Sequence, residues 1–278
     1  MPAFAETAYA KINLALHIRR RRADGYHDIE TLFAFADDGD RLTATSGDDI
    51  RLTVTGTFGE GLSSPDNLVV RTAELMRENF AVDQGAAITL DKRLPVASGI
   101  GGGSADAAAT ARLLRRLWSI EADDDALERL LAPLGADIPA CVQSRTVFGD
   151  GTGADLQRVS DAGIHGKAVL LVNPLQPVAT GPVFRAWDSI DRGELNTIDP
   201  WHGAMAGRND LETPAISICP AIRDVLNMLS QTEADLVRMS GSGATCFALY
   251  ATTIARDTAQ CDISEACPGW WTMASFLR

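Results

Sequence analysis

The residues of this chain best suited to chemistry are four closely spaced glycines. Gly99, Gly101, Gly102 and Gly103 lie in the run 94–106, and the alanine- and leucine-rich segment 104–118 that follows predicts a helix. Glycine adopts backbone conformations that other residues avoid and lets a ligand approach the main chain closely. A helix N-terminus adds N–H groups and the positive end of the helix dipole. The run therefore predicts a phosphate-binding loop and a nucleotide ligand.

The residues at the end of the loop show which type of glycine-rich loop it is. A Walker A loop requires a lysine before its final Ser or Thr, whereas here Gly103 is followed directly by Ser104. A dinucleotide fingerprint that starts at Gly99 requires Gly or Ala at position 104 and a strand ending in an acidic residue further on, where this sequence predicts a second helix. A turn capped by Ser104 without a ligand would not need four glycines.

Further candidate residues lie near the N-terminus and in the middle of the chain. Residues 8–18 alternate in polarity, which places Lys11 and Asn13 on one face of a strand, and the turn Asp24-Gly25 brings Tyr26 and His27 to the start of the next strand. Lys11 alone is typical of an exposed strand lysine. Asp137, which precedes Ile-Pro, is typical of a helix N-cap.

The elements that must position these residues alternate irregularly. Helices are predicted at 67–80, 104–118, 123–134, 222–229 and 254–266, and strands at 8–18, 28–36, 51–57, 87–90, 168–172, 245–250 and 270–276. Strands and helices without regular βα alternation favour an α+β fold. The weakly patterned stretch 150–166 is the candidate boundary between an N-terminal domain, 1–158, and a C-terminal domain, 159–278.

Composition limits the class of protein. A net charge of −12 argues against general nucleic-acid binding. There is no apolar run of membrane-spanning length, and residues 1–6 lack the basic and apolar regions of a secretory signal, so neither a membrane span nor secretion is expected. The five cysteines are odd in number and lack metal-site spacing, so free thiols in a reducing cytoplasm are expected. The basic run 19–22 is more typical of a solvated turn than of a specific site.

Several ordered motifs extend the interpretation of the loop. The run 95–105, PVASGIGGGSA, resembles the phosphate loop of the GHMP kinases, although the broad family has a serine pair where this chain has Gly103-Ser104. The Gly-Gly-Gly-Ser-Ala-Asp ending is similar to one branch, which phosphorylates the 2-hydroxyl of a cytidine-diphosphate-linked methylerythritol in non-mevalonate isoprenoid synthesis. The motifs AKINL, RADGYHDI, PDNL, LGADIP, NDLE and MSGSGATCF, in this order between residues 10 and 247, match the same branch.

The resemblance implies a fold and a set of site residues. The N-terminal domain would be like domain 2 of ribosomal protein S5, and the C-terminal domain would be ferredoxin-like. Lys11 would stand beside the acceptor hydroxyl and Asp137 would be the general base. The implied ATP-binding residues are Asn67, Lys92, Pro95, Val96, Ala97, Ser98, Gly99, Ile100, Gly101, Gly102, Gly103, Ser104 and Ala105; the implied substrate-binding residues are Asn13, Tyr26, His27, Phe184, Gly241 and Ser242.

The resemblance also implies ligands and leaves alternatives. Mg²⁺ is expected with ATP, with Ser104 as a candidate contact and no carboxylate as an obvious ligand. Phe184 could instead be a core residue, and residues 240–243 a plain turn between strands. The alternative functions are a GHMP kinase for another small alcohol, of homoserine or mevalonate type, and a nucleotide-binding oxidoreductase or sensor. No feature of the sequence predicts an oligomeric state.

Overall fold

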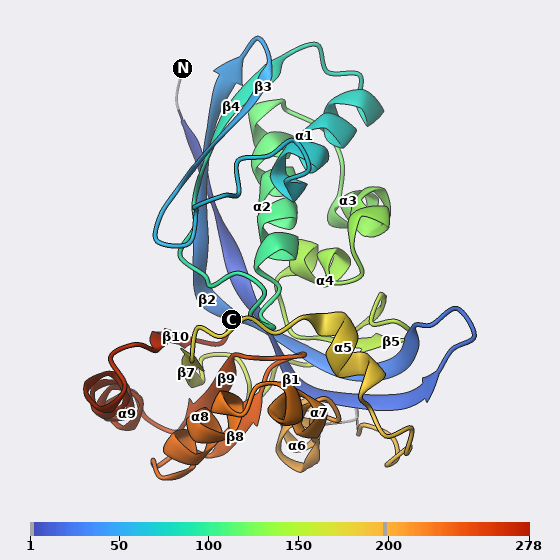
Figure 1. The fold of residues 1–278 in the computed structure, drawn as a ribbon. Coiled ribbons are helices and arrows are strands. Elements are labelled where there is room, and N and C mark those ends of the chain that lie inside the picture. The colour runs from blue at the N-terminus through green and yellow to red at the C-terminus, as the bar shows by residue number, and fades with distance from the viewer. Residues whose placement is uncertain (1–2, 197–198) are drawn as a thin grey trace. The chain divides into compact units, whose positions relative to one another are not determined.

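The chain folds into two compact units that interleave along the sequence. The computed structural model describes residues 3–196 and 199–278. The first unit comprises residues 3–10, Asp38–Val96 and Gly101–Ser144, and the second comprises Lys11–Asp37, Ala97–Ile100 and Arg145–Arg278. Both units contain helices and strands, which confirms the α+β class (Figure 1). The boundary predicted near residue 158 divides the sequence rather than these interleaved units, and it stays a prediction.

The first unit is a set of strands covered by helices. Its central strand β4 (Gly85–Asp91) pairs antiparallel with the end of β2 (His27–Gly47) and parallel with β3 (Ile50–Thr55). Helices lie on one side of these strands: α1 (Leu68–Asn79), α2 (Gly102–Leu117), α3 (Asp124–Leu131) and α4 (Ile138–Gln143) (Figure 1). Helix α2 contacts both α1 and α4, and its buried alanines, 107–109 among them, allow this close packing.

The second unit is built around a four-stranded antiparallel sheet in the order β10-β7-β9-β8. All six residues of β7 (Ala168–Asn173) are buried, because β10 (Trp271–Phe276) and β9 (Cys246–Tyr250) flank this strand and helices α8 (Ala221–Ser230) and α9 (Thr253–Ala266) pack on the sheet. The remaining elements here are β8 (Leu236–Met239), β5 (Val147–Asp150), β6 (Asp155–Arg158), α5 (Thr180–Arg185), α6 (Pro200–Ala206) and α7 (Glu212–Ile218).

Two strands contribute to both units. In β1 (Phe4–Arg21), residues 4–10 belong to the first unit and the remainder to the second. In β2 the order is reversed: residues up to Asp37 belong to the second unit and residues from Asp38 onward to the first. In the second unit, residues 31–33 of β2 pair with β5, which in turn pairs with β6. Because β1 also pairs with β2, the two strands that carry Lys11 and His27 are both held by sheet hydrogen bonds.

The predicted elements are present, with shifted ends. The helix expected at 104–118 begins earlier, at Gly102, because Gly101 at its N-cap adopts a left-handed conformation (φ +65°) that turns the chain into the helix. The helix expected at 123–134 changes at Ala132 into a 3₁₀ turn, η1 (Ala132–Leu134), which contains Pro133. The short elements α4 to α7, β5, β6 and β8 have too few residues for periodicity to reveal them. None of the described helices combines the length and apolarity needed to cross a bilayer.

Candidate active site

The predicted site residues are shared between the two units. The first unit holds Asn67, Lys92, Pro95, Val96, Gly101, Gly102, Gly103, Ser104, Ala105 and Asp137; the second holds Lys11, Asn13, Tyr26, His27, Ala97, Ser98, Gly99, Ile100, Phe184, Gly241 and Ser242. Most residues predicted to bind ATP therefore surround the start of α2, and the residues predicted to bind the second substrate all lie in the second unit.

Gly99 is required by packing within the second unit. Its φ is +76°, and a Cβ atom placed on it would lie 2.5 Å from the carbonyl oxygen of Ser240. The Ser240 hydroxyl donates a hydrogen bond of 3.0 Å to the Gly99 carbonyl, and the Thr245 N–H donates to the Ser98 carbonyl. The loop thus packs directly on the second glycine turn of the sequence, 240–243. The need for glycine at position 99 follows from this contact and does not require a ligand.

In the first turn of α2, Gly103 is not required by packing in the way that Gly99 is. A Cβ atom at Gly102 would lie 3.2 Å from Lys92 Nζ, but one at Gly103 would meet only Leu68 Cδ1, at 3.5 Å, among the described residues. Gly103 is exposed and Ser104 is half-buried. The N–H groups of a first helical turn have no partners inside the helix. Gly103 therefore leaves its backbone open to an approaching anion, which is the geometry a phosphate site requires.

A buried ion cluster fixes both ends of this loop. Lys92 Nζ lies 2.5 Å from Asp40 Oδ2 and 2.6 Å from Asp106 Oδ2, and all three side chains are buried. The other oxygen of Asp40 accepts hydrogen bonds from the N–H groups of Arg93 (2.6 Å) and Leu94 (2.8 Å). The cluster thus joins the chain entering the loop to Asp106 in α2. Asp40 and Asp106 were not predicted as functional residues.

The cluster changes the pKa values of its members. Burial raises the pKa of Asp106 to about 7, and Asp40 adds to the shift while Lys92 opposes it. Burial works against the charge of Lys92, but the carboxylates of Asp106 and Asp40 outweigh it and raise the lysine pKa. Asp106 Oδ1 is buried and has no hydrogen-bond partner among the described residues. Lys92 is thus a cation held by carboxylates beside the helix that begins at the glycine loop.

Two predicted residues of the first unit lie at helix starts. Asn67 caps α1, because its Oδ1 accepts the Val69 N–H at 2.9 Å while its Nδ2 donates to the Leu62 carbonyl at 2.8 Å. Asp137 occupies the N-cap position of α4, as predicted, but its side chain makes no capping hydrogen bond to the helix. Asp137 is half-buried, and Pro139 fixes the start of the helix behind it.

In the second unit, Lys11 is part of a buried chain of polar contacts. Lys11 Nζ donates to Asn13 Oδ1 at 2.8 Å, and Asn13 Nδ2 donates to Thr31 Oγ1, also at 2.8 Å. The predicted placement of Lys11 and Asn13 on one strand face is confirmed by this contact. The Lys11 N–H donates to the Ile100 carbonyl, and Lys11 Nζ lies 5.0 Å from the centre of the Phe33 ring. Lys11 is 3% exposed, so the interpretation as an exposed strand lysine is wrong.

The second glycine turn lies against this chain. Ser240 Oγ accepts the Asn13 N–H at 3.1 Å, and a Cβ atom on Gly241 would lie 3.2 Å from Asn13 Oδ1. Asn209 Nδ2 donates to the carbonyls of Met239 and Gly241, each at 2.8 Å. Ser242 Oγ is 3.0 Å from Thr180 Oγ1. The turn is therefore more than a link between β8 and β9, because side chains from distant elements hold its conformation.

Two of the residues predicted to bind a base, His27 and Phe184, are in ring contact, and His27 is buried (6% exposed). The rings of His27 and Phe184 have centroids 5.1 Å apart, tilted by 42°, and the Trp187 ring meets His27 edge-on at 5.7 Å. Tyr26, next to His27, is 65% exposed. Phe184 is half-buried and also contacts the core of the second unit. An exposed tyrosine beside a packed His–Phe pair is a suitable surface for a planar base.

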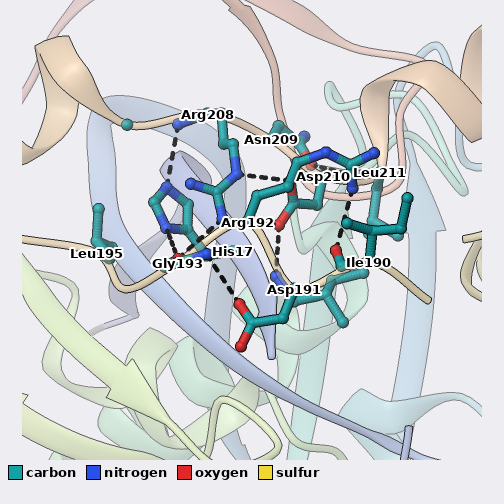
Figure 2. A network of polar contacts seen from close by, with 12 residues as sticks. His17, Ile190, Asp191, Arg192, Gly193, Leu195, Arg208, Asn209, Asp210 and Leu211 are labelled. Atoms are coloured by element: carbon teal, nitrogen blue, oxygen red, sulfur yellow. Dashed lines mark hydrogen bonds and ion pairs between the residues drawn. The ribbon is translucent and has the colours of Figure 1, made fainter. Parts of the chain in front are cut away.

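A second polar network of this unit was not predicted. His17 lies between two backbone groups, its Nδ1 at 3.1 Å from the Gly193 carbonyl and its Nε2 accepting the Arg208 N–H at 3.2 Å (Figure 2). Arg208 also pairs with Asp210 at 2.7 Å. Burial, followed by the charge of Arg208, lowers the pKa of His17. This neutral histidine fixes the segment around Gly193 against β1.

Comparisons with known proteins agree with this arrangement. Residues 67–145 match the family model of the GHMP kinase N-terminal domain, and residues 191–269 match that of the C-terminal domain. The chain is 55% identical, over 98% of both sequences, to a 4-diphosphocytidyl-2-C-methyl-D-erythritol kinase of Sphingopyxis alaskensis.

Solved structures give the same result. A crystal structure of 4-(cytidine 5'-diphospho)-2C-methyl-D-erythritol kinase superposes with a TM-score of 0.82 at 31% identity, and 98% of each chain is covered. A homoserine kinase from Cytophaga hutchinsonii shares the fold alone, with a TM-score of 0.74 at 17% identity over 100% of this chain and 95% of that one. The predicted two-domain fold is confirmed. The chain belongs to the GHMP kinase family.

Proposed function

We propose that this chain is an ATP-dependent kinase that transfers the γ-phosphoryl group of ATP to the 2-hydroxyl of 4-diphosphocytidyl-2-C-methyl-D-erythritol, a step of non-mevalonate isoprenoid synthesis. The observation that carries the choice of substrate is the His27–Phe184 ring pair beside Tyr26. A GHMP kinase for homoserine or mevalonate has no base to bind and no need of this surface. The 55% identity with the Sphingopyxis alaskensis kinase supports the same choice.

ATP would bind through the start of α2. Its phosphates would meet the N–H groups of the first helical turn, where Gly103 leaves room and the dipole of the 16-residue helix favours negative charge. The ion cluster of Lys92, Asp40 and Asp106 would hold the loop in this conformation. Asn67 and Lys92 would lie on the adenine side of the nucleotide.

The chemical step would use one carboxylate and one ammonium group. Asp137 would accept the proton of the attacking hydroxyl, and Lys11, oriented by Asn13, would stabilise the charge that develops on the oxygen. The hydroxyl oxygen forms the new bond to the γ-phosphorus as the bond to the β-phosphate oxygen breaks, and ADP leaves. Positioning and electrostatic stabilisation would supply most of the rate enhancement.

Mg²⁺ would accompany the triphosphate and neutralise part of its charge. The described residues contain no cluster of three or more His, Cys, Asp or Glu side chains able to hold a metal. This fits an ion that keeps several waters and is bound mainly by substrate phosphates, with the Ser104 hydroxyl as the protein contact. None of the described cysteines, Cys141, Cys219, Cys246, Cys261 and Cys267, forms a disulfide, which fits work in a reducing cytoplasm.

The test is a coupled assay of ADP release with ATP, Mg²⁺ and the cytidyl substrate. We expect phosphorylation at the 2-hydroxyl, identified by ³¹P NMR of the product. Homoserine and mevalonate serve as competing acceptors under the same conditions. Turnover of either alcohol without turnover of the cytidyl substrate would reject the proposed function.

A further inference from the structure

Four consecutive arginines, Arg19 to Arg22, lie where β1 ends at Arg21, and one of them differs from the others. Arg19 pairs with Glu30 and Asp191, Arg20 pairs with Asp28, and Arg22 pairs with Asp24 and Asp28. Arg21 makes no ion pair with a carboxylate of the described residues. Arg21 is an exposed residue, and its side chain contacts the aromatic cluster formed by His27, Phe184 and Trp187 and the backbone beside it.

Arg21 joins two elements that carry this aromatic cluster. Its Nε–H donates to Nε2 of His27, the first residue of β2, at 3.3 Å. Its Nη2 donates to the carbonyl oxygen of Arg185, the last residue of α5, at 3.1 Å. Phe184 precedes Arg185 in the same helix. One planar side chain thus links the element that carries His27 to the element that carries Phe184.

The contact also determines the form of the histidine. A guanidinium has no acceptor and stays protonated, so His27 Nε2 must carry a lone pair and the ring proton must be on Nδ1. Burial lowers the pKa of His27, and the charge of Arg21 lowers it further. His27 is therefore neutral at physiological pH, in a single tautomer that Arg21 selects.

From this geometry we propose that Arg21 is a positioning residue for the cytosine base of the substrate. It holds His27 in the Nδ1–H form and fixes the distance between the His27 and Phe184 rings. The inference rests on the proposed function, because it assumes that the base binds at this surface. Arg21 touches neither ATP nor the acceptor hydroxyl in this scheme, so its loss should weaken binding of one substrate only.

The first experiment compares the kinetics of Arg21→Met with those of a matched control. Arg20→Met removes the same charge from the adjacent position, where the side chain is 77% exposed and pairs with Asp28. We expect Arg21→Met to raise KM for the cytidyl substrate roughly tenfold, as two lost hydrogen bonds would. KM for ATP and kcat should stay within about twofold of wild type, and Arg20→Met should leave all three constants unchanged.

A second variant separates geometry from charge. Arg21→Lys keeps the positive charge but cannot reproduce the planar pair of donors. We expect its KM for the cytidyl substrate to stay raised. Recovery of the wild-type KM in Arg21→Lys would show that charge alone is needed and would overturn the proposal, as would an unchanged KM in Arg21→Met.

The tautomer gives a readout that does not depend on turnover. In protein with ¹⁵N-labelled histidine, His27 should show a protonated Nδ1 and an unprotonated Nε2, with the signals assigned by their loss in His27→Gln. Arg21→Met should convert this pattern to a mixture of tautomers, and an unchanged pattern would overturn the proposal. If wild type fails to turn over the cytidyl substrate at all, the proposed function fails; if wild type is active and only the predicted Arg21 effects are missing, this inference fails alone.

Discussion

Lys92 and Asp106 form a buried ion pair that joins the segment between β4 and the glycine loop to helix α2, which follows the loop. The distance from Nζ to Oδ2 is 2.6 Å, and Asp40 completes the cluster on the other side of the lysine. The conformation of the loop therefore depends on charges outside the loop itself.

Replacement of Lys92 tests this dependence. Lys92→Met leaves two buried carboxylates without their cation, so we expect the free energy of unfolding to fall by about 3–5 kcal/mol. Urea unfolding of the variant and wild type at pH 7.5 measures the difference. Arg93→Met is the control, since Arg93 is exposed and pairs with Asp91 at the surface; its effect should stay below about 1 kcal/mol.

The raised pKa of Asp106 predicts a pH dependence of stability. The folded state holds this proton up to about pH 7, whereas the unfolded state releases it near the ordinary value of 3.8. The stabilising contribution of the group is complete below pH 3.8 and is lost as the pH rises to about 7. Asp106→Asn should remove this component, and parallel stability curves of variant and wild type across that range would contradict it.

The lowered pKa of His17 predicts the opposite pH dependence, with stability that rises with pH. Its pKa is lowered from 6.5, so the unfolded state takes up the proton first as the solution is acidified. Stability should fall as the pH drops below about 6.5, because a proton on Nε2 would displace the Arg208 N–H. In His17→Asn this loss should be absent when unfolding is followed between pH 5 and 7. A steeper loss in the variant would rule out His17 as its source.

The glycines of the loop should separate stability from function. Gly99→Ala places a methyl group against the Ser240 carbonyl at a positive φ, and we expect it to destabilise the fold by at least about 2 kcal/mol. Gly103→Ala meets only Leu68, so thermal stability should be kept or raised by about 0.5–1 kcal/mol, while KM for ATP rises. Thermal unfolding and steady-state kinetics of the two variants measure these effects. An unchanged KM for ATP in Gly103→Ala would show that no phosphate of ATP binds at this position.

The roles of Asp137 and Lys11 can be tested by asking whether their replacement impairs ATP binding or the chemical step. Asp137→Asn should bind ATP normally and lose about 10²- to 10⁴-fold in kcat, as expected for loss of a general base. Lys11→Met should also lower kcat, whereas Asp123→Asn keeps a cap on α3, outside the proposed site, and serves as a folded control. ATP binding by calorimetry and single-turnover ADP formation distinguish binding from chemistry. Retained turnover in Asp137→Asn would exclude it as the base.

The sequence predicted local structure better than distant contacts. The alternation along β1 correctly placed Lys11 beside Asn13, and the glycine-rich composition correctly located the start of α2 to within two residues. The ion cluster could not be predicted, because Asp40 and Lys92 are 52 residues apart and no periodicity links them. The same holds for His17 and Arg208, which are 191 residues apart. Asp137 shows a further limit, since the sequence correctly placed it at the N-cap of α4 but did not show that its side chain makes no capping hydrogen bond.

The interleaving of the two units has a consequence for dissecting the protein. Each unit is assembled from three separate stretches of chain, and β1 and β2 each contribute to both. A single cut between residues 96 and 145 or after residue 145 cannot release either unit whole. Expression of a C-terminal fragment beginning at residue 145 would lack 11–37, and with it the strand to which β5 pairs. Loss of activity in truncated or split forms of this chain would therefore report incomplete folding rather than the removal of one substrate site.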